Sequence, residues 1–176
     1  MSTRKILIIP GLNSSGPDHW QSHWERTLPN IERIHQRDYE APICSEWIDT
    51  IQKKVESVGP DAILVGHSSG AIAISHWAKK FGTPIAGAML VGPSDVERAD
   101  FPYQITGFKP IALDRFSFPS IVVASSNDPY VTLERATYFA SRWGSKLVNV
   151  GPAGHINTAS GHGPWPEGIE LLRELL

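Results

Sequence analysis

Short apolar runs alternate along the chain with longer segments in which apolar residues recur at helical spacing. Runs rich in Val and Ile that end at Gly, Pro or polar residues predict buried strands, at residues 5–9, 31–36, 62–65, 85–91, 120–124 and 146–150. Helical periodicity predicts helices at residues 17–28, 45–58, 69–81, 132–143 and 166–176. Such alternation is typical of α/β proteins, so we expect a parallel sheet of about six strands with helices on both faces.

Composition narrows the class of protein further. A length of 176 residues fits one domain, residues 1–176, with a sizeable core. Sixteen Lys and Arg against eighteen Asp and Glu give a formal net charge of -2, and no run of like charges offers a face to nucleic acid or to an anionic membrane. Cys44 is the only cysteine, and the apolar run at 6–9 is too short for a signal sequence or a membrane span. We therefore expect a soluble cytoplasmic protein whose partner is a small molecule.

The stretch "GHSSG" follows the third predicted strand and opens the third predicted helix. A Gly-x-Ser-x-Gly turn in that place is typical of a nucleophile elbow, in which a strained serine projects from the apex of a tight turn. Gly66 and Gly70 have no side chain, and a side chain at either position would collide with neighbouring backbone. Ser68 is thus the candidate nucleophile, and the Ser69 N–H, which has no acceptor within the helix, is a candidate oxyanion donor. His67 is expected to pack beside the nucleophile rather than to act.

A serine hydroxyl needs a base to take its proton and an acid to orient that base. In a sheet with this turn, the acid and the histidine follow later strands in that order. Asp128 comes just after the fifth predicted strand and His155 just after the sixth, so we predict that they complete a catalytic triad with Ser68. Asp95, which follows the fourth strand, and His162 are the alternatives for these two roles.

The loop after the first predicted strand is expected to carry the second oxyanion donor. The Leu12 N–H is the favoured donor and Asn13 the alternative. The spacing of Gly11 and Gly16 in this loop matches the start of a phosphate-binding loop. The two residues after Gly16, however, are Pro and Asp, where that motif has Lys and then Ser or Thr. Nucleotide binding is therefore not expected.

His19 and His23 stand four residues apart, the spacing of a zinc-binding pair on a helix. Trp20 stands where such a motif carries its catalytic Glu, and no third ligand is evident in the sequence. Packing of Trp20 and Trp24 beside two polar histidines is the ordinary explanation. Neither a metal nor an organic cofactor is expected.

Residues 93–119 fit neither a helix nor a strand, because prolines and glycine interrupt a stretch rich in aromatic rings. The segment is longer than most loops in compact domains. We expect it to form a small cap in which Phe101, Tyr103 and Phe108 help to build an acyl pocket, although these rings would also suit the core. Candidate substrate contacts are Phe101 and Phe108 from this segment, with Asn13 and Trp20 from the first loop and helix.

Four stretches carry a resemblance to a known family: "ILIIPGLNSSGPDHWQSHWE", "LVGHSSGAIAI", "SSNDPYV" and "GPAGHINTASGHGPWPEG". In that order they resemble the small serine hydrolases of the α/β-hydrolase superfamily grouped with retinoblastoma-binding protein 9 and the bacterial YdeN proteins. The resemblance covers nearly the whole chain and implies an α/β-hydrolase core with little or no cap. It also implies Ser68 as nucleophile, Asp128 as acid and His155 as base.

One feature of some relatives is absent here. Those relatives contact the retinoblastoma pocket through a Leu-x-Cys-x-Glu motif, whereas Cys44 and Glu46 of this chain follow Pro42 in the leucine position. A retinoblastoma-type partner is therefore not expected.

Together these patterns predict a serine hydrolase that cleaves an ester, thioester or amide through an acyl-enzyme. The alternative is a protein of the same fold that binds a partner with little or no turnover. An intact triad favours the enzyme, and covalent labelling by a fluorophosphonate distinguishes the two.

Overall fold

A central parallel sheet organises the chain, as the alternating pattern predicts. The computed structural model describes residues 4–176. Its sheet has six strands in the order β2-β1-β3-β4-β5-β6, every neighbouring pair parallel. The strands are β1 (Lys5–Ile9), β2 (Ile31–Arg33), β3 (Ala62–His67), β4 (Gly87–Val91), β5 (Ser120–Ala124) and β6 (Lys146–Asn149).

Four strands differ in length from the prediction. β4 begins at Gly87 instead of residue 85, and β6 ends at Asn149 instead of residue 150. β3 runs on to His67, so the strand leads directly into the tight turn. β2 ends at Arg33 instead of residue 36 because it is an edge strand and the chain then leaves the sheet. There the Gln36 N–H donates to the Tyr39 hydroxyl, and the Gln36 side chain donates to the Trp47 carbonyl.

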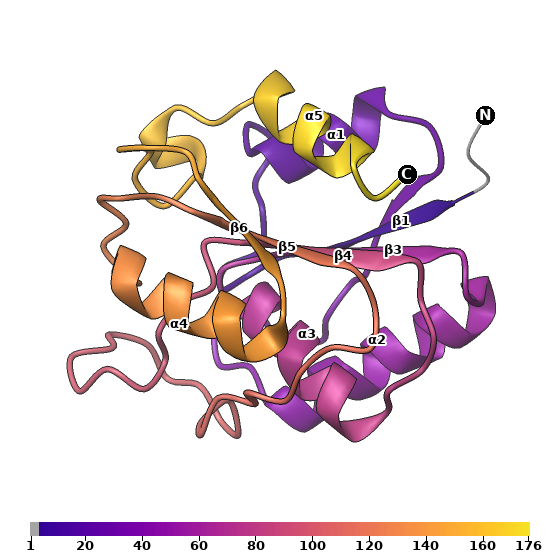
Figure 1. Ribbon diagram of the computed structural model, residues 1–176, viewed down its shortest axis with the longest axis horizontal. Helices are drawn as coiled ribbons and strands as arrows, with labels where there is room; N and C mark the ends of the chain where they lie inside the picture. The colour runs from indigo at the N-terminus through magenta and orange to yellow at the C-terminus, as the bar shows by residue number, and fades with distance from the viewer. Residues whose placement is uncertain (1–3) are drawn as a thin grey trace.

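Helices cover both faces of the sheet (Figure 1). One face carries α1 (Trp20–Thr27) and α5 (Pro166–Arg173), and the other carries α2 (Cys44–Val58), α3 (Ser69–Lys80) and α4 (Leu133–Trp143). Apolar side chains of the four central strands β1, β3, β4 and β5 alternate between these two layers and are buried on both, as parallel sheets require. Within residues 4–176, no helix is both long enough and apolar enough to cross a bilayer.

The segment 93–119 forms no helix or long strand, and its only ladder contact is an isolated bridge between Ile43 and Thr106. Most of its apolar side chains turn into the α2–α4 layer, where Phe108 is fully buried and Phe116 stacks on Trp143. The expectation that this whole segment caps a site is therefore wrong. Its second half covers the core, and only its first part approaches the carboxyl edge of the sheet.

That carboxyl edge gathers the candidate residues. β1, β3, β5 and β6 run parallel, so the loops that follow them emerge on the same side of the sheet. Each of these loops carries at least one predicted site residue, namely Leu12, Ser68, Asp128 and His155 in turn.

Candidate active site

The turn between β3 and α3 is as tight as the sequence predicts. Ser68 has φ 59° and ψ -125°, a left-handed conformation that is strained for a residue with a side chain. The flanking glycines are needed for space. A Cβ at Gly70 would lie 2.4 Å from the Ile9 carbonyl oxygen, and one at Gly66 would lie 2.8 Å from the Ala71 nitrogen. The turn thus places a strained, half-buried Ser68 at its apex.

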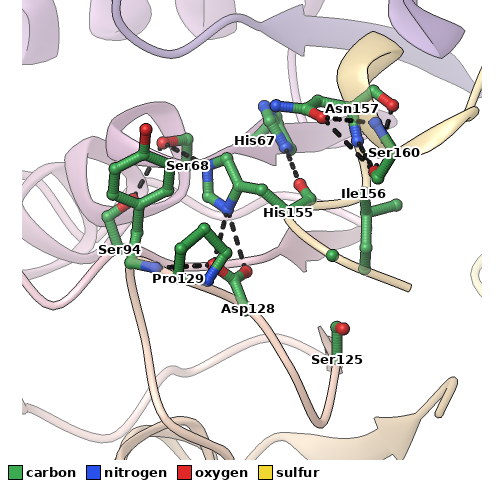
Figure 2. A network of polar contacts seen from close by, with 12 residues as sticks. His67, Ser68, Ser94, Ser125, Asp128, Pro129, His155, Ile156, Asn157 and Ser160 are labelled. Carbon is green, nitrogen blue, oxygen red and sulfur yellow. Dashed lines mark hydrogen bonds and ion pairs between the residues drawn. The ribbon is translucent and has the colours of Figure 1, made fainter. Parts of the chain in front are cut away.

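Three predicted side chains meet in one hydrogen-bonded series (Figure 2). The distance from Ser68 Oγ to His155 Nε2 is 3.0 Å, and His155 Nδ1 lies 2.9 and 2.8 Å from the two carboxylate oxygens of Asp128. Asp128 also accepts the Tyr130 N–H at 2.9 Å, and its side chain is fully buried. A buried carboxylate on Nδ1 fixes the ring so that Nε2 faces the serine hydroxyl.

The alternatives for acid and base have other partners. Asp95 accepts two hydrogen bonds from the Arg135 guanidinium, at 2.9 and 3.1 Å. His162 Nδ1 contacts the Ser160 hydroxyl at 3.1 Å. Neither side chain is part of the hydrogen-bonded series of Ser68.

His67 contacts the main chain of this series. Its Nε2 lies 2.8 Å from the His155 carbonyl oxygen (Figure 2), and because a carbonyl only accepts, Nε2 carries the proton. Burial holds the pKa of His67 well below its usual value, so the ring is neutral. His67 packs beside the nucleophile as expected, and it also anchors the main chain of His155.

Ser94 is a contact that the sequence interpretation missed. Its hydroxyl is buried and lies 2.8 Å from Ser68 Oγ. Since the single Ser68 proton points to His155, the Ser94 hydroxyl donates to Ser68 Oγ. The available signal was the position of Ser94 just after β4, the same placement that pointed to Asp128 and His155.

The two predicted oxyanion donors differ in the structure. The Ser69 N–H stands at the first position of α3 and has no acceptor four residues back in the helix. The Leu12 N–H, by contrast, donates to Ser69 Oγ at 3.0 Å. The alternative Asn13 N–H donates to the Tyr39 carbonyl at 2.9 Å. Both N–H groups therefore have acceptors within the protein, and the role of Leu12 as oxyanion donor stays a prediction.

A small cavity of about 160 Å³ opens beside Ser68. Asn13 and Phe101 line it, as expected. One wall is aromatic: the hydroxyls of Tyr103 and Tyr130 are 3.1 Å apart, and the Tyr130 ring lies 4.6 Å from the His155 ring between centroids. The remaining lining residues are Leu12, Ser14, His19, His67, Ser94, His155 and Asn157.

The chain is similar to known proteins along almost its whole length. A family model described as serine hydrolase matches residues 6–174. The chain belongs to this serine hydrolase family. A YdeN-like hydrolase from Pectobacterium atrosepticum is 39% identical, with a TM-score of 0.84 over 97% of this chain and 89% of that one. The resemblance to YdeN proteins predicted from the sequence is confirmed.

More distant structures share the fold of this serine hydrolase. The ydeN gene product of B. subtilis is 20% identical, with a TM-score of 0.82 over 98% of both chains. An alpha/beta hydrolase fold protein from Burkholderia ambifaria is 12% identical, with a TM-score of 0.72 over 97% of this chain and 89% of that one. The predicted α/β-hydrolase fold is thereby confirmed. Proteins with curated descriptions give no match.

Two expected substrate contacts of the serine hydrolase do not line the cavity. Trp20 is fully buried against Trp24 and Trp165, and its indole N–H donates to the Ile156 carbonyl at 2.9 Å. Phe108 packs edge-on against Trp47 of α2, with ring centroids 5.6 Å apart. Trp20 and Phe108 are both core residues, because burying a large apolar ring in a close-packed layer is more favourable than exposing it at a polar cavity.

Alanine substitutions separate the two phenylalanines. Phe108→Ala is expected to destabilise the fold by about 3–5 kcal/mol, since it empties a fully buried site, while the ranking of p-nitrophenyl esters by chain length stays unchanged. Phe101→Ala is expected to change that ranking with a smaller loss of stability, because Phe101 is only partly buried and lines the cavity. Chemical denaturation and an ester series measure both effects. A changed ranking in Phe108→Ala alone would contradict this assignment.

Proposed function

We propose that this serine hydrolase cleaves an ester, thioester or amide of a small substrate through a covalent acyl-enzyme on Ser68. The observation that carries the proposal is the series from Ser68 through His155 to Asp128, with contacts of 3.0 Å and 2.8 Å, beside an open cavity. This is the arrangement that turns a serine hydroxyl into a nucleophile at neutral pH.

Acylation begins when Ser68 Oγ attacks the carbonyl carbon while His155 Nε2 takes the hydroxyl proton. The buried Asp128 carboxylate stabilises the imidazolium that forms. Negative charge develops on the carbonyl oxygen, and the Ser69 N–H at the start of α3 is placed to donate to it. His155 then gives the proton to the leaving group, whose bond to the carbonyl carbon breaks.

In deacylation, water is the nucleophile and Ser68 Oγ is the leaving group. His155 takes a proton from a water molecule, which attacks the acyl carbonyl carbon, and returns that proton to Ser68 Oγ as the ester bond breaks. Ser94, which donates to Ser68 Oγ, supports the same oxygen while it is the leaving group. One water is consumed, and the acid product leaves with Ser68 restored.

The cavity suits a small, uncharged acyl group. Its volume of about 160 Å³ is below the roughly 300–1,000 Å³ of pockets that hold drug-sized ligands. Among the residues that the structure describes, none of those lining it is Asp, Glu, Lys or Arg. Burial lowers the pKa of His19 to about 3, and the hydrogen bond that Tyr130 shares with Tyr103 raises the pKa of Tyr130, so these groups stay neutral near pH 7.

A series of p-nitrophenyl esters tests both the function and the size limit. We expect acetate and butyrate esters to be hydrolysed with kcat/KM at least about tenfold higher than the decanoate ester, because methylene groups beyond the cavity gain no contacts. Ser68→Ala is the matched control and should show only the buffer rate. A decanoate rate equal to or above the acetate rate would contradict the size limit, and absence of any enzymatic rate would contradict the function.

A further inference from the structure

The cavity of this hydrolase is lined mainly by neutral polar side chains. Within the part of the chain that the structure describes, Leu12 and Phe101 are the only purely apolar residues that line it. Pockets for ordinary small molecules are lined predominantly by hydrophobic and aromatic side chains, with only a few polar groups. A plain alkyl group would displace water from these polar groups without replacing its hydrogen bonds, which costs free energy. The lining therefore favours a substrate that can form hydrogen bonds of its own.

Two tyrosine hydroxyls form one side of the cavity. Tyr103 and Tyr130 both line it, and their hydroxyl oxygens are 3.1 Å apart. Among residues 4–176, no other group forms a hydrogen bond with either hydroxyl. One hydroxyl donates to the other, so one O–H proton of the pair has no acceptor, whichever of the two is the donor. The pair therefore offers the cavity a spare hydrogen-bond donor.

Tyr130 is the member of this pair that is fixed beside the catalytic residues. Its N–H donates to Asp128 Oδ1, and its carbonyl accepts the Asp95 N–H, each at 2.9 Å. Its ring meets the His155 ring edge-on, with centroids 4.6 Å apart. Tyr103, by contrast, is 38% exposed and lies in a segment without regular secondary structure. The contacts of Tyr130 thus hold its side chain at a set place relative to His155.

The spare donor selects the chemistry of its partner. An O–H group without an acceptor is complemented by an acceptor oxygen on the substrate. A carboxylate would also accept, but no Lys or Arg of the described chain lines the cavity, and the Asp128 carboxylate lies 2.8 Å from His155 Nδ1. A second negative charge there would have no cation to pair with. A neutral ether or amide oxygen fits these conditions.

We propose that the acyl group of the substrate carries a neutral acceptor oxygen, which binds the Tyr130 O–H while Tyr103 donates to Tyr130. The inference rests on the proposed acyl-enzyme function and narrows its substrate class from small uncharged acyl groups to those with an ether or amide oxygen. Tyr130 is then a residue that determines specificity. The covalent steps at Ser68 are unchanged.

Two matched pairs of p-nitrophenyl esters test this preference, because in each pair an oxygen replaces one methylene group. The pairs are methoxyacetate with butyrate and 3-methoxypropanoate with pentanoate. Each kcat/KM is divided by the rate constant for hydroxide-catalysed hydrolysis of the same ester, which removes differences in intrinsic reactivity. We expect the ether ester to be preferred by about fivefold in at least one pair, the gain that one neutral hydrogen bond supplies.

Three tyrosine variants separate the hydroxyl from the ring. Tyr130→Phe keeps the ring and removes the donor, so the preference should fall below about twofold. Tyr103→Phe leaves the Tyr130 hydroxyl but removes its hydrogen-bond partner, so the preference should fall by less. Tyr138→Phe is the matched control, because Tyr138 is an exposed residue of α4 that does not line the cavity, and the preference should not change.

The proposal is overturned if the unsubstituted protein prefers neither ether ester, if Tyr130→Phe retains the preference, or if Tyr103→Phe loses more of it than Tyr130→Phe. Ser68→Ala gives the background rate. If the unsubstituted protein hydrolyses none of the four esters above that background, the proposed function fails and the role of Tyr130 fails with it. Hydrolysis that depends on Ser68 but shows no preference for an ether rejects only the role of Tyr130.

Discussion

Ser68→Ala is expected to lower kcat for an activated ester by about 10⁴- to 10⁶-fold, because it removes the only atom that can form the acyl-enzyme. The change removes a half-buried hydroxyl that contacts His155 and Ser94, and alanine fits the same turn. The melting temperature should therefore change little. Steady-state hydrolysis and thermal unfolding of the same preparation measure the two effects.

The neighbouring hydroxyl gives a matched control. Ser69→Ala keeps the Ser69 N–H and removes only the acceptor of the Leu12 N–H, so its loss of kcat should be far smaller. If Ser68→Ala retained more than about a tenth of the activity, or if Ser69→Ala were the more damaging change, another residue would be the nucleophile.

Asp128→Asn is expected to lower kcat by about 10⁴-fold, since an amide beside Nδ1 no longer holds the ring tautomer in which Nε2 accepts the Ser68 proton. Two contacts, at 2.9 and 2.8 Å, depend on that carboxylate. The fold should survive, because Asn occupies nearly the same volume and its amide oxygen can still accept the Tyr130 N–H. Burst and steady-state kinetics of an activated ester measure the loss.

Asp95→Asn is the control for a carboxylate at the same sheet edge. Asp95 pairs with Arg135 rather than with His155, so its substitution should lower stability by about 1–3 kcal/mol and leave kcat within roughly threefold. If Asp95→Asn lowered kcat more than Asp128→Asn, the catalytic acid would lie after β4. That result would contradict the role assigned to Asp128.

The central strands of the sheet could be predicted from the sequence because they are buried on both faces. Such strands consist of continuous apolar runs in the sequence. The predicted ends of β1, β3 and β5 therefore lie within two residues of the observed ends. Ser68, Asp128 and His155 could be picked out for a related reason. Parallel strands put the loops at their carboxyl ends on one edge, so position along the chain alone brings the three residues together.

The pocket was harder to predict because it depends on the path of irregular backbone. Phe101 and Phe108 belong to one aromatic segment, yet the first lines the cavity and the second packs on α2. No periodicity distinguishes them. Likewise, Asn13 and Ser14 both have φ 60°, a left-handed conformation that sets the path of the β1 loop along the cavity. That conformation is rare for residues other than glycine, and a sequence pattern does not reveal it.

Mass spectrometry of the intact protein after reaction with a fluorophosphonate tests most directly whether Ser68 is an activated nucleophile. One adduct per chain is expected, located by peptide analysis on Ser68, and it should be absent from Ser68→Ala and strongly slowed in Asp128→Asn. An unmodified chain, or an adduct that persists in Ser68→Ala, would contradict the assignment of Ser68, His155 and Asp128 as the catalytic residues.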